Sequence, residues 1–345
     1  MKPGSRPPLG PQRPTGWLVN AGCAVLALIG AAGGRSEAAV AADLTPVKAG
    51  ISGPANTVLA MYMAKAAGFY RARGLDVDII STNGGSRGAA ELQAGRIDIM
   101  HVGMSSVVKA NLAGGDLRTI ASLSNAIRFV LFAAPKVKNA ADLEGGVIAV
   151  SAFGSESDST VTLALKPLGL TRADVTLKEL GGGDRRLAAL KAGEIQASPL
   201  NEPYSSLAHE HGLLPLVDLM AEKIPWLFSS IVVRRADITG RRDILKRFLQ
   251  ATIEGNYLAL ADVARAKQVL AQELKITDAK ILDIVLEDFK AQTPPNMEIS
   301  REGAANILAE LPKAPASLDG YLDTVLLDEL RVSGFFAEMA KKYGK

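Results

Sequence analysis

Residues 74–98 read GLDVDIISTNGGSRGAAELQAGRID, and residues 172–196 read RADVTLKELGGGDRRLAALKAGEIQ. The two stretches align without a gap at an offset of 98 residues. They share the aspartate–valine pair, the glycine pair with its arginine, and the leucine, alanine, glycine and isoleucine that follow. A repeat this long, present only twice, does not fit a solenoid. It indicates two similar lobes.

Each copy of the repeat joins a strand pattern to a helix pattern. Leu75, Val77 and Ile79 alternate with polar or small residues, as in a half-buried strand. Residues 88–94 follow with a helical pattern, and Gly95 ends it, which is a common use of glycine after a helix. Alternating strands and helices predict a parallel sheet with helices on its faces. The predicted fold class is therefore α/β, with two similar lobes.

Two extended apolar runs, residues 129–133 and 230–233, lie on either side of the second repeat. We expect the chain to cross between the lobes at these runs. The first lobe then comprises residues 43–133 and 230–345, including a helical tail that packs back on it, and residues 134–229 form the second lobe. Two rigid lobes joined in this way close over a ligand by hinge motion.

The amino terminus has the pattern of a secretory signal peptide. A proline- and glycine-rich start with three basic residues is followed by an apolar run at residues 22–32 and by small residues at 39–42. The apolar run is shorter than the roughly 20 residues that span a membrane. Residues 1–42 are therefore predicted to be a cleaved signal peptide, and the mature protein to be periplasmic. An uncleaved amino-terminal anchor is the alternative.

Charge and cysteine content narrow the function further. Four of the 39 Lys and Arg residues and one of the 36 Asp and Glu residues lie in residues 1–42, which leaves 35 of each in the mature chain. A neutral body does not favour nucleic acid as a partner, because neutralising phosphates requires a basic face. Cys23 is the only cysteine and lies in the predicted signal peptide. The mature chain therefore has no thiol for a disulfide or for catalysis.

Short motifs follow one another in a set order from residue 68 onward. They are GFY at 68–70, GLDV at 74–77, LQAGRID at 92–98, ADLEG at 141–145, Gly154-Ser155, LGL at 168–170 and AGEIQA at 192–197. In this order they resemble the signature of the SsuA/TauA/NMT1-THI5-like binding proteins, over about residues 47–235. Gln196 is a departure, since the family often has Asp there.

This resemblance implies the type II periplasmic-binding-protein fold, in which two crossovers join the lobes around a ligand cleft. It also implies the solute-binding component of an ABC importer, which delivers a sulfonate, nitrate, a pyrimidine or an aromatic acid to the membrane permease. We expect a monomer that uses no cofactor and binds a small organic solute.

The repeat also locates the ligand cleft. In open α/β sheets ligands bind beyond the carboxyl ends of the strands, and the repeat pairs the loops that follow equivalent strands. Glycine-rich loops that enter helices present N–H groups suited to an oxyanion, although the same glycines also serve simple turns. The residues expected to bind the solute are Asn56, Asn83, Gly84, Ser86, Gly103, Ser105, Gly154, Ser155, Glu156, Asp184, Asn201, Glu202 and Trp226.

Several of these residues also have structural interpretations. Asp184 can cap the helix that follows it. Acidic residues such as Glu156 and Glu202 are common near a helix amino terminus without any ligand. Trp226 can stack on a planar solute or be a buried hinge aromatic. If the three acids do face the cleft, they repel a small bare anion, which favours an organic solute with a polar or charged nitrogen.

An enzyme on the same scaffold, resembling the pyrimidine synthase branch of the family, is the alternative function. His101, His209 and His211 form no HExxH pattern, and no GxSxG motif occurs. The cysteine-rich motif of that branch is absent too, and so is a cluster of metal ligands. No catalytic or metal-binding residue is therefore expected.

Overall fold

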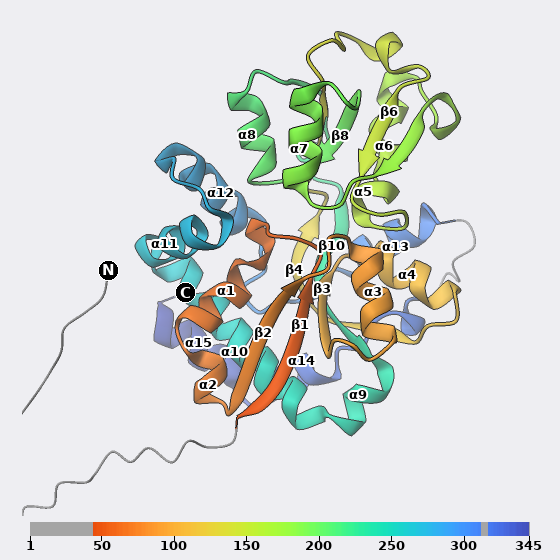
Figure 1. The fold of residues 1–345 in the computed structure, drawn as a ribbon. Helices are drawn as coiled ribbons and strands as arrows, with labels where there is room; N and C mark the ends of the chain where they lie inside the picture. The colour runs from red at the N-terminus through yellow and green to blue at the C-terminus, as the bar shows by residue number, and fades with distance from the viewer. Residues whose placement is uncertain (1–43, 312–316, 345) are drawn as a thin grey trace, which may run out of the picture. The chain divides into compact units, whose positions relative to one another are not determined.

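A computed structural model describes residues 44–311 and 317–344, so the predicted signal peptide lies outside the described residues. The described chain forms two mixed sheets (Figure 1). The first has the order β2 (Leu75–Ser81), β1 (Thr45–Ile51), β3 (Ile99–Val102), β10 (Pro225–Arg234), β4 (Leu117–Ala126). The second has the order β7 (Thr176–Glu179), β6 (Val147–Val150), β8 (Ala197–Leu200), β5 (Val130–Ala133), β9 (Leu214–Asp218).

The helices divide between the two sheets and a carboxyl-terminal tail. With the first sheet lie α1 (Leu59–Ala66), α2 (Phe69–Ala72), α3 (Gly85–Gln93) and α4 (Met104–Leu112). With the second lie α5 (Glu156–Ser159), α6 (Val161–Leu165), α7 (Gly183–Ala192) and α8 (Tyr204–Glu210). The tail contains α9 (Arg235–Gly240), α10 (Arg242–Ala261), α11 (Val263–Leu274), α12 (Ala279–Gln292), α13 (Arg301–Ala309), α14 (Val325–Val332) and α15 (Phe335–Tyr343).

The two sheets follow the same plan, which confirms the predicted fold class. Strands β2, β1 and β3 pair in parallel, as do β7, β6 and β8, and the fourth strand of each sheet, β10 or β5, is antiparallel to its neighbours. Gly95 and Gly193, equivalent in the repeat, follow α3 and α7 with φ of 72° and 71°. Glycine adopts this left-handed conformation without strain, so both helices end by the same device.

The crossings between the lobes differ from those predicted. The sequence placed residues up to 133 in the first lobe, but β5 pairs with β8 and β9 of the second sheet. It also placed residues up to 229 in the second lobe, but β10 joins the first sheet from Pro225. The chain therefore crosses between residues 126 and 130 and between residues 218 and 225. An extended apolar run suits either sheet equally well, so its sequence does not reveal which one it joins.

The tail packs largely on the first lobe. Helix α10 lies against α1 and α2, α14 against β4, and α13 against β10. Helix α12 also contacts α8 of the second lobe. Gly255 permits the closest of these approaches, because a Cβ atom there would lie 2.3 Å from the carbonyl oxygen of Ala60 and 2.7 Å from the amide nitrogen of Ala64.

Replacing Gly255 with alanine should therefore destabilise the protein by about 1–3 kcal/mol, the usual range for overpacking. This loss exceeds the roughly 0.5–1 kcal/mol that alanine gains over glycine inside a helix. Urea unfolding of the purified protein measures the difference. Gly240→Ala is the matched control, since a Cβ atom there meets nothing within 4 Å. Equal stability of the two variants would contradict the close contact between α10 and α1.

Candidate functional site

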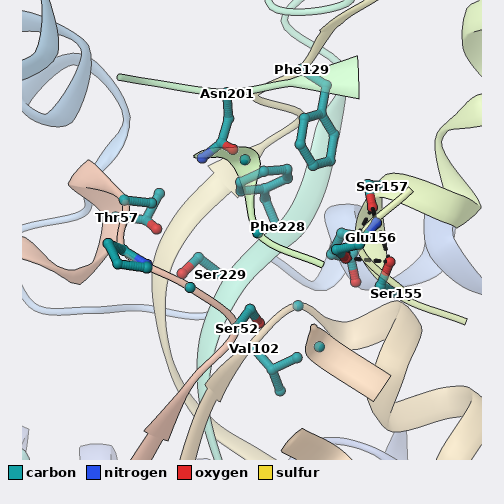
Figure 2. Close-up of a pocket in the computed structure, with 18 of the residues that line it drawn as sticks. Ser52, Thr57, Val102, Phe129, Ser155, Glu156, Ser157, Asn201, Phe228 and Ser229 are labelled. Atoms are coloured by element: carbon teal, nitrogen blue, oxygen red, sulfur yellow. Dashed lines mark hydrogen bonds between the residues drawn. The ribbon is translucent and has the colours of Figure 1, made fainter. Parts of the chain in front are cut away.

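A cavity of about 90 Å³ lies between the two sheets, at the loops that follow their parallel strands. Figure 2 shows Phe129 and Asn201 at one end, Ser52 and Val102 at the other, and Glu156 facing Thr57 across it. Its lining comprises Ser52, Gly53, Pro54, Ala55, Thr57, Gly85, His101, Val102, Gly103, Phe129, Ser151, Ser155, Glu156, Ser157, Gly182, Gly183, Arg186, Asn201, Tyr204, Phe228 and Ser229. Both lobes contribute to the wall, as the repeat predicts.

One part of the wall is aromatic. Phe129 and Phe228 pack edge to face, with ring centroids 4.9 Å apart and an interplanar angle of 72°. Phe129 lies in the first crossing between the lobes and Phe228 in β10 just after the second, and both are buried. Tyr204, at the start of α8, adds a half-buried ring whose hydroxyl pKa is raised to about 12 by burial. These rings give the cavity an apolar surface of the kind that holds the carbon skeleton of a solute.

Glu156 is the buried acid of the cavity. Its Oε1 accepts a hydrogen bond from the Ser105 amide at 2.6 Å, and its Oε2 accepts from the Ser105 hydroxyl at 2.9 Å and from the Trp226 indole N–H at 2.7 Å. Burial raises the pKa of Glu156 to about 7 in spite of these donors, which act to lower it. Gly103 makes room for the carboxylate, since a Cβ atom there would lie 2.3 Å from Oε1.

Arg186 is the buried cation of the cavity, and it is 3% exposed. It donates to the carbonyl oxygens of Gly181 at 3.1 Å and of Pro199, and to the Ser198 hydroxyl at 3.3 Å. None of the ion pairs found within residues 44–311 and 317–344 includes it. Desolvation lowers the pKa of its guanidinium to about 10. A buried guanidinium held by neutral acceptors leaves its charge available to an anion in the cavity.

Helix α7 carries this arginine and points its amino end at the same space. Gly182 and Gly183, which begin the helix, both line the cavity, and no side chain caps the helix there. The unpaired N–H groups of a helix amino terminus favour negative charge. Arg186 and the start of α7 therefore form a positively polarised wall in the second lobe.

Four of the predicted solute-binding residues line the cavity: Gly103, Ser155, Glu156 and Asn201. Ser105 lies directly behind Glu156 and is fully buried. Asn56 does not line the cavity, because its amide donates to the Val285 carbonyl at 3.2 Å and to the Asp288 carboxylate at 2.7 Å. Asn56 thus ties η1 (Asn56–Val58) to the tail helix α12.

Other predicted residues lie where the two lobes touch beside the cavity. The Ser86 hydroxyl donates to the Phe153 carbonyl at 2.7 Å, and a Cβ atom on Gly84 would lie 2.9 Å from that of Ala152. Gly154 donates its amide to Asp158 within the second lobe. Asn83 and Asp184 are exposed. Asn83, Gly84, Ser86 and Gly154 belong to the contact between the lobes, Asp184 is simply exposed, and none of the five is part of the cavity wall.

Glu202 and Trp226 also lie away from the cavity lining. The Glu202 carboxylate accepts from the Ser205 hydroxyl at 2.5 Å and from the Ser206 amide at 3.4 Å, on the side of α8 that faces α12. Trp226 is 1% exposed and packs in the apolar core that joins the lobes. Trp226 was expected either to stack on a solute or to be a buried hinge aromatic. The structure fits the buried hinge aromatic, because the indole N–H donates a hydrogen bond to Glu156.

Arg186 was missed because the repeat directs attention to Arg185, the equivalent of Arg87. Arg185 is exposed, whereas Arg186 lies on the buried face of α7 with Gly183, Leu187 and Leu190. Counted from Gly183, these residues lie three, four and seven positions along, which places them on one face of a helix. This spacing is the sequence feature that could have identified Arg186 as buried. Phe129, Tyr204 and Phe228 carry no comparable signal, since an aromatic residue in an apolar run fits a core equally well.

A serine and a histidine also meet at the cavity wall. Nε2 of His101 lies 2.5 Å from the Ser229 hydroxyl and 3.1 Å from the Thr57 carbonyl oxygen. The roles of these groups depend on the histidine tautomer. A hydrogen on Nε2 is donated to the Thr57 carbonyl, which only accepts, whereas a hydrogen on Nδ1 leaves Nε2 to accept from the Ser229 hydroxyl. Burial lowers the pKa of His101 to about 4, so His101 is a weak base toward Ser229.

Within the described part of the chain, no group of three His, Cys, Asp or Glu side chains is placed to hold a metal ion. No helix found there is both long and apolar enough to cross a membrane.

Comparison with known proteins identifies the family. A family model described as NMT1/THI5 like matches residues 55–266. The chain belongs to the NMT1/THI5-like family. A curated relative, the riboflavin-binding protein RibY of Chloroflexus aurantiacus, is 26% identical to this NMT1/THI5-like chain over 233 residues, which cover 66% of the chain and 65% of RibY. The match thus spans less than two thirds of that relative's length.

Solved structures share the fold of this NMT1/THI5-like protein. The alkanesulfonate-binding protein SsuA of Xanthomonas axonopodis pv. citri, bound to MOPS, has a TM-score of 0.64 at 21% identity and covers 80% of this chain and 96% of its own. The ligand-binding component of an ABC-type import system from Staphylococcus aureus has a TM-score of 0.67 at 16% identity and covers 83% and 98%. These likenesses confirm the periplasmic-binding-protein fold.

The aromatic wall depends on a glycine, which leads to a prediction. A Cβ atom on Gly183 would lie 2.2 Å from the ring of Tyr204, so Gly183→Ala should displace that ring. We expect thermal unfolding of the solute-free protein to show a loss of about 1–3 kcal/mol. Gly53→Ala, in the facing loop, is the control, because its nearest neighbour would be Gly182 Cα at 3.9 Å. If Gly183→Ala is as stable as the control, the ring does not rest on the start of α7.

Proposed function

We propose that this protein is the solute-binding component of an ABC importer and that it binds a small organic anion in the cavity between its lobes. The observation that carries the proposal is Arg186, a buried guanidinium at the cavity wall that donates its hydrogen bonds to two carbonyl oxygens and a hydroxyl, all neutral. Burying such a charge is costly unless an anion compensates it. The fold shared with an alkanesulfonate-binding protein and with an ABC import component supports this assignment.

The size and chemistry of the cavity restrict the solute. At about 90 Å³ it is smaller than an engineered cavity of about 150 Å³ that admits benzene. A compact anion fits between the lobes as they stand, whereas a flavin requires them to lie further apart. Asn201 lines the same cavity, so a solute that also carries a hydroxyl or amine has a hydrogen-bond partner there. Glu202 has no role in this site, because its carboxylate is bonded to Ser205 and Ser206 of α8.

An enzyme is the second class of function to consider, because the desulfurization enzyme DSZB shares the fold, with a TM-score of 0.62 at 16% identity over 84% of this chain and 99% of its own. The His101–Ser229 contact favours it, and the pKa of about 4 to which burial lowers His101 argues against a role for it as a general base. Incubation with a bound solute separates the two classes, since a binding protein returns the solute unchanged.

Export follows from the proposed role. We propose that residues 1–42 direct the chain to the periplasm, where it acts as a monomer with the membrane permease as its partner. The mature protein should begin at Ala42 or Asp43, because the small-residue cleavage site ends there. Intact-mass spectrometry of the periplasmic fraction measures this. A membrane-bound form that retains Met1 would instead indicate an uncleaved anchor.

The anion site has a direct test in the paired arginines of α7. Arg186→Gln should weaken binding of the preferred anion by about 10- to 100-fold, since a hydrogen bond to a charged group contributes about 1.5–3 kcal/mol. Isothermal titration calorimetry against a short alkanesulfonate, a short carboxylate, nitrate and riboflavin measures the affinities. Arg185→Gln removes an equal charge from the exposed neighbour and is the matched control.

The outcomes are distinguishable. Both variants are first compared by thermal unfolding, because Arg186 also holds the Gly181 and Pro199 carbonyls. Loss of anion binding only in a folded Arg186→Gln protein supports the proposal. Equal affinities in Arg186→Gln and Arg185→Gln would show that the guanidinium does not contact the solute.

A further inference from the structure

Glu156 reaches from one lobe into the other. It is the first residue of α5 in the second lobe, and its three hydrogen-bond donors all belong to the first lobe. Ser105 supplies two of them from α4, and Trp226 supplies the third from β10. The carboxylate, both partners and their contacts are buried. The Glu156 side chain therefore makes three hydrogen bonds from the second lobe to the first, at the cavity wall.

The carboxylate occupies the place where a solute anion would be held on the first lobe. The Ser105 amide is one of the N–H groups at the amino end of α4, a helix of nine residues, and no side chain of its own segment caps it. A helix amino end of this kind favours negative charge. Gly103 permits the approach, since any Cβ atom there would collide with Glu156. The first lobe thus binds a carboxylate that the second lobe provides.

A buried apolar cluster and a 3.4 Å hydrogen bond from the Ser106 hydroxyl to the Gly154 carbonyl also join the lobes, but the ion pairs between them near the cavity are more exposed. Arg87 and Glu179 form an ion pair across the rim at 2.8 Å, with side chains 45% and 30% exposed. Lys109 pairs with Asp158 at 3.1 Å, and here the lysine is 34% exposed and the aspartate 4%. An exposed pair such as Arg87–Glu179 contributes little, because water and salt screen it. Buried hydrogen bonds to a charged group are stronger.

We propose that the Glu156 carboxyl group fastens the two lobes together in the solute-free protein, through its hydrogen bonds to the amino end of α4 and to Trp226, and that the cleft opens when this contact breaks. The inference rests on the proposed function only in taking the cavity as the place where a solute enters. Its consequence is that solute binding competes with a closed empty form, which reduces the apparent affinity by the fraction of molecules that are closed.

The contact is linked to a proton. Burial raises the pKa of Glu156 from about 4.5 to about 7, and a carboxyl in the open, hydrated cleft has its ordinary pKa. Closing therefore takes up a proton, so the closed form is favoured in acid and loses that advantage as pH rises from about 4.5 to about 7. In the protonated form the Ser105 hydroxyl can turn and accept the carboxyl hydrogen, while the amide and indole N–H groups still donate.

Three neighbours of Glu156 have pKa values displaced out of this window. In spite of its burial, hydrogen bonds from the Gly154 amide and from Arg172 hold the pKa of Asp158 on α5 below its ordinary value. On the other walls of the cavity, the pKa of His101 is about 4 and that of Arg186 is about 10. A pH response of lobe closure between about 5 and 7 is therefore assigned to Glu156.

The test measures lobe separation without any solute, so its result does not depend on whether the proposed anion binds. Spin labels are placed at Ala90→Cys on α3 and Ala188→Cys on α7, both exposed and equivalent in the repeat. The chain from residue 43 onward contains no other cysteine, so labelling is unambiguous. Double electron–electron resonance then gives the distribution of distances between the lobes.

Glu156→Gln is the decisive variant. The glutamine NH2 group replaces one of the two carboxylate oxygens. In one orientation it faces the Ser105 amide N–H and in the other the Trp226 indole N–H, so a donor meets a donor and a hydrogen bond is lost in both. We expect the ratio of closed to open molecules to fall about tenfold or more, as for loss of buried charge-assisted hydrogen bonds. Glu179→Gln, which removes the exposed ion pair with Arg87, is the matched control and should leave the distances unchanged.

A second variant keeps the test decisive if Glu156→Gln fails to fold. Trp226→Phe removes one donor and keeps the packing, and it should also shift the distances toward the open form. In the wild type the closed fraction should fall between pH 5 and pH 7, and in Glu156→Gln it should not change with pH. Distances that match the wild type in both variants, or that shift equally in Glu179→Gln, would overturn the proposal. A solute-free wild type that is already open would overturn it as well.

Discussion

The carboxylate of Glu156 accepts hydrogen bonds from three donors of the opposite lobe, and much of the cavity depends on this contact. This contact holds α5 against α4, so that the loops following β3 and β6 enclose the cavity between them. It also explains why Gly103 carries no side chain and why Trp226 is buried with its N–H satisfied. A buried acid without such donors would cost several kcal/mol.

The second lobe supplies both charges of the cavity. Glu156 is engaged by the first lobe, whereas Arg186 is held by neutral acceptors and keeps its charge for a ligand. His101 stays neutral because burial lowers its pKa to about 4. The wall thus has one side whose hydrogen bonds the protein itself completes, and another side whose charge the proposed solute anion would balance. This division is the physical basis for assigning an anionic solute to an acid-lined cavity.

The repeat was sufficient to predict the architecture. Strand and helix periodicity recurring at an offset of 98 residues requires two sheets of the same plan, and β2, α3 and β3 do recur as β7, α7 and β8. The crossings were placed a few residues late, because an apolar strand such as β5 carries no mark of the sheet it joins. Likewise, Gly103, Ser155, Glu156 and Asn201 were found because loops after parallel strands must meet at one edge.

The direction of individual side chains was decided by the tertiary structure alone. Asn56 and Glu202 sit on loops that do approach the cleft, yet they bond to α12 and to α8 instead. Arg185 and Arg186 are adjacent and chemically identical, and only the packing of α7 on the second sheet turns one into water and the other into the cavity. Sequence periodicity determines which elements form and in what order they stack, because that depends on local patterns of burial. Which polar group meets which partner depends on atoms brought together from distant parts of the chain, and no local pattern specifies that.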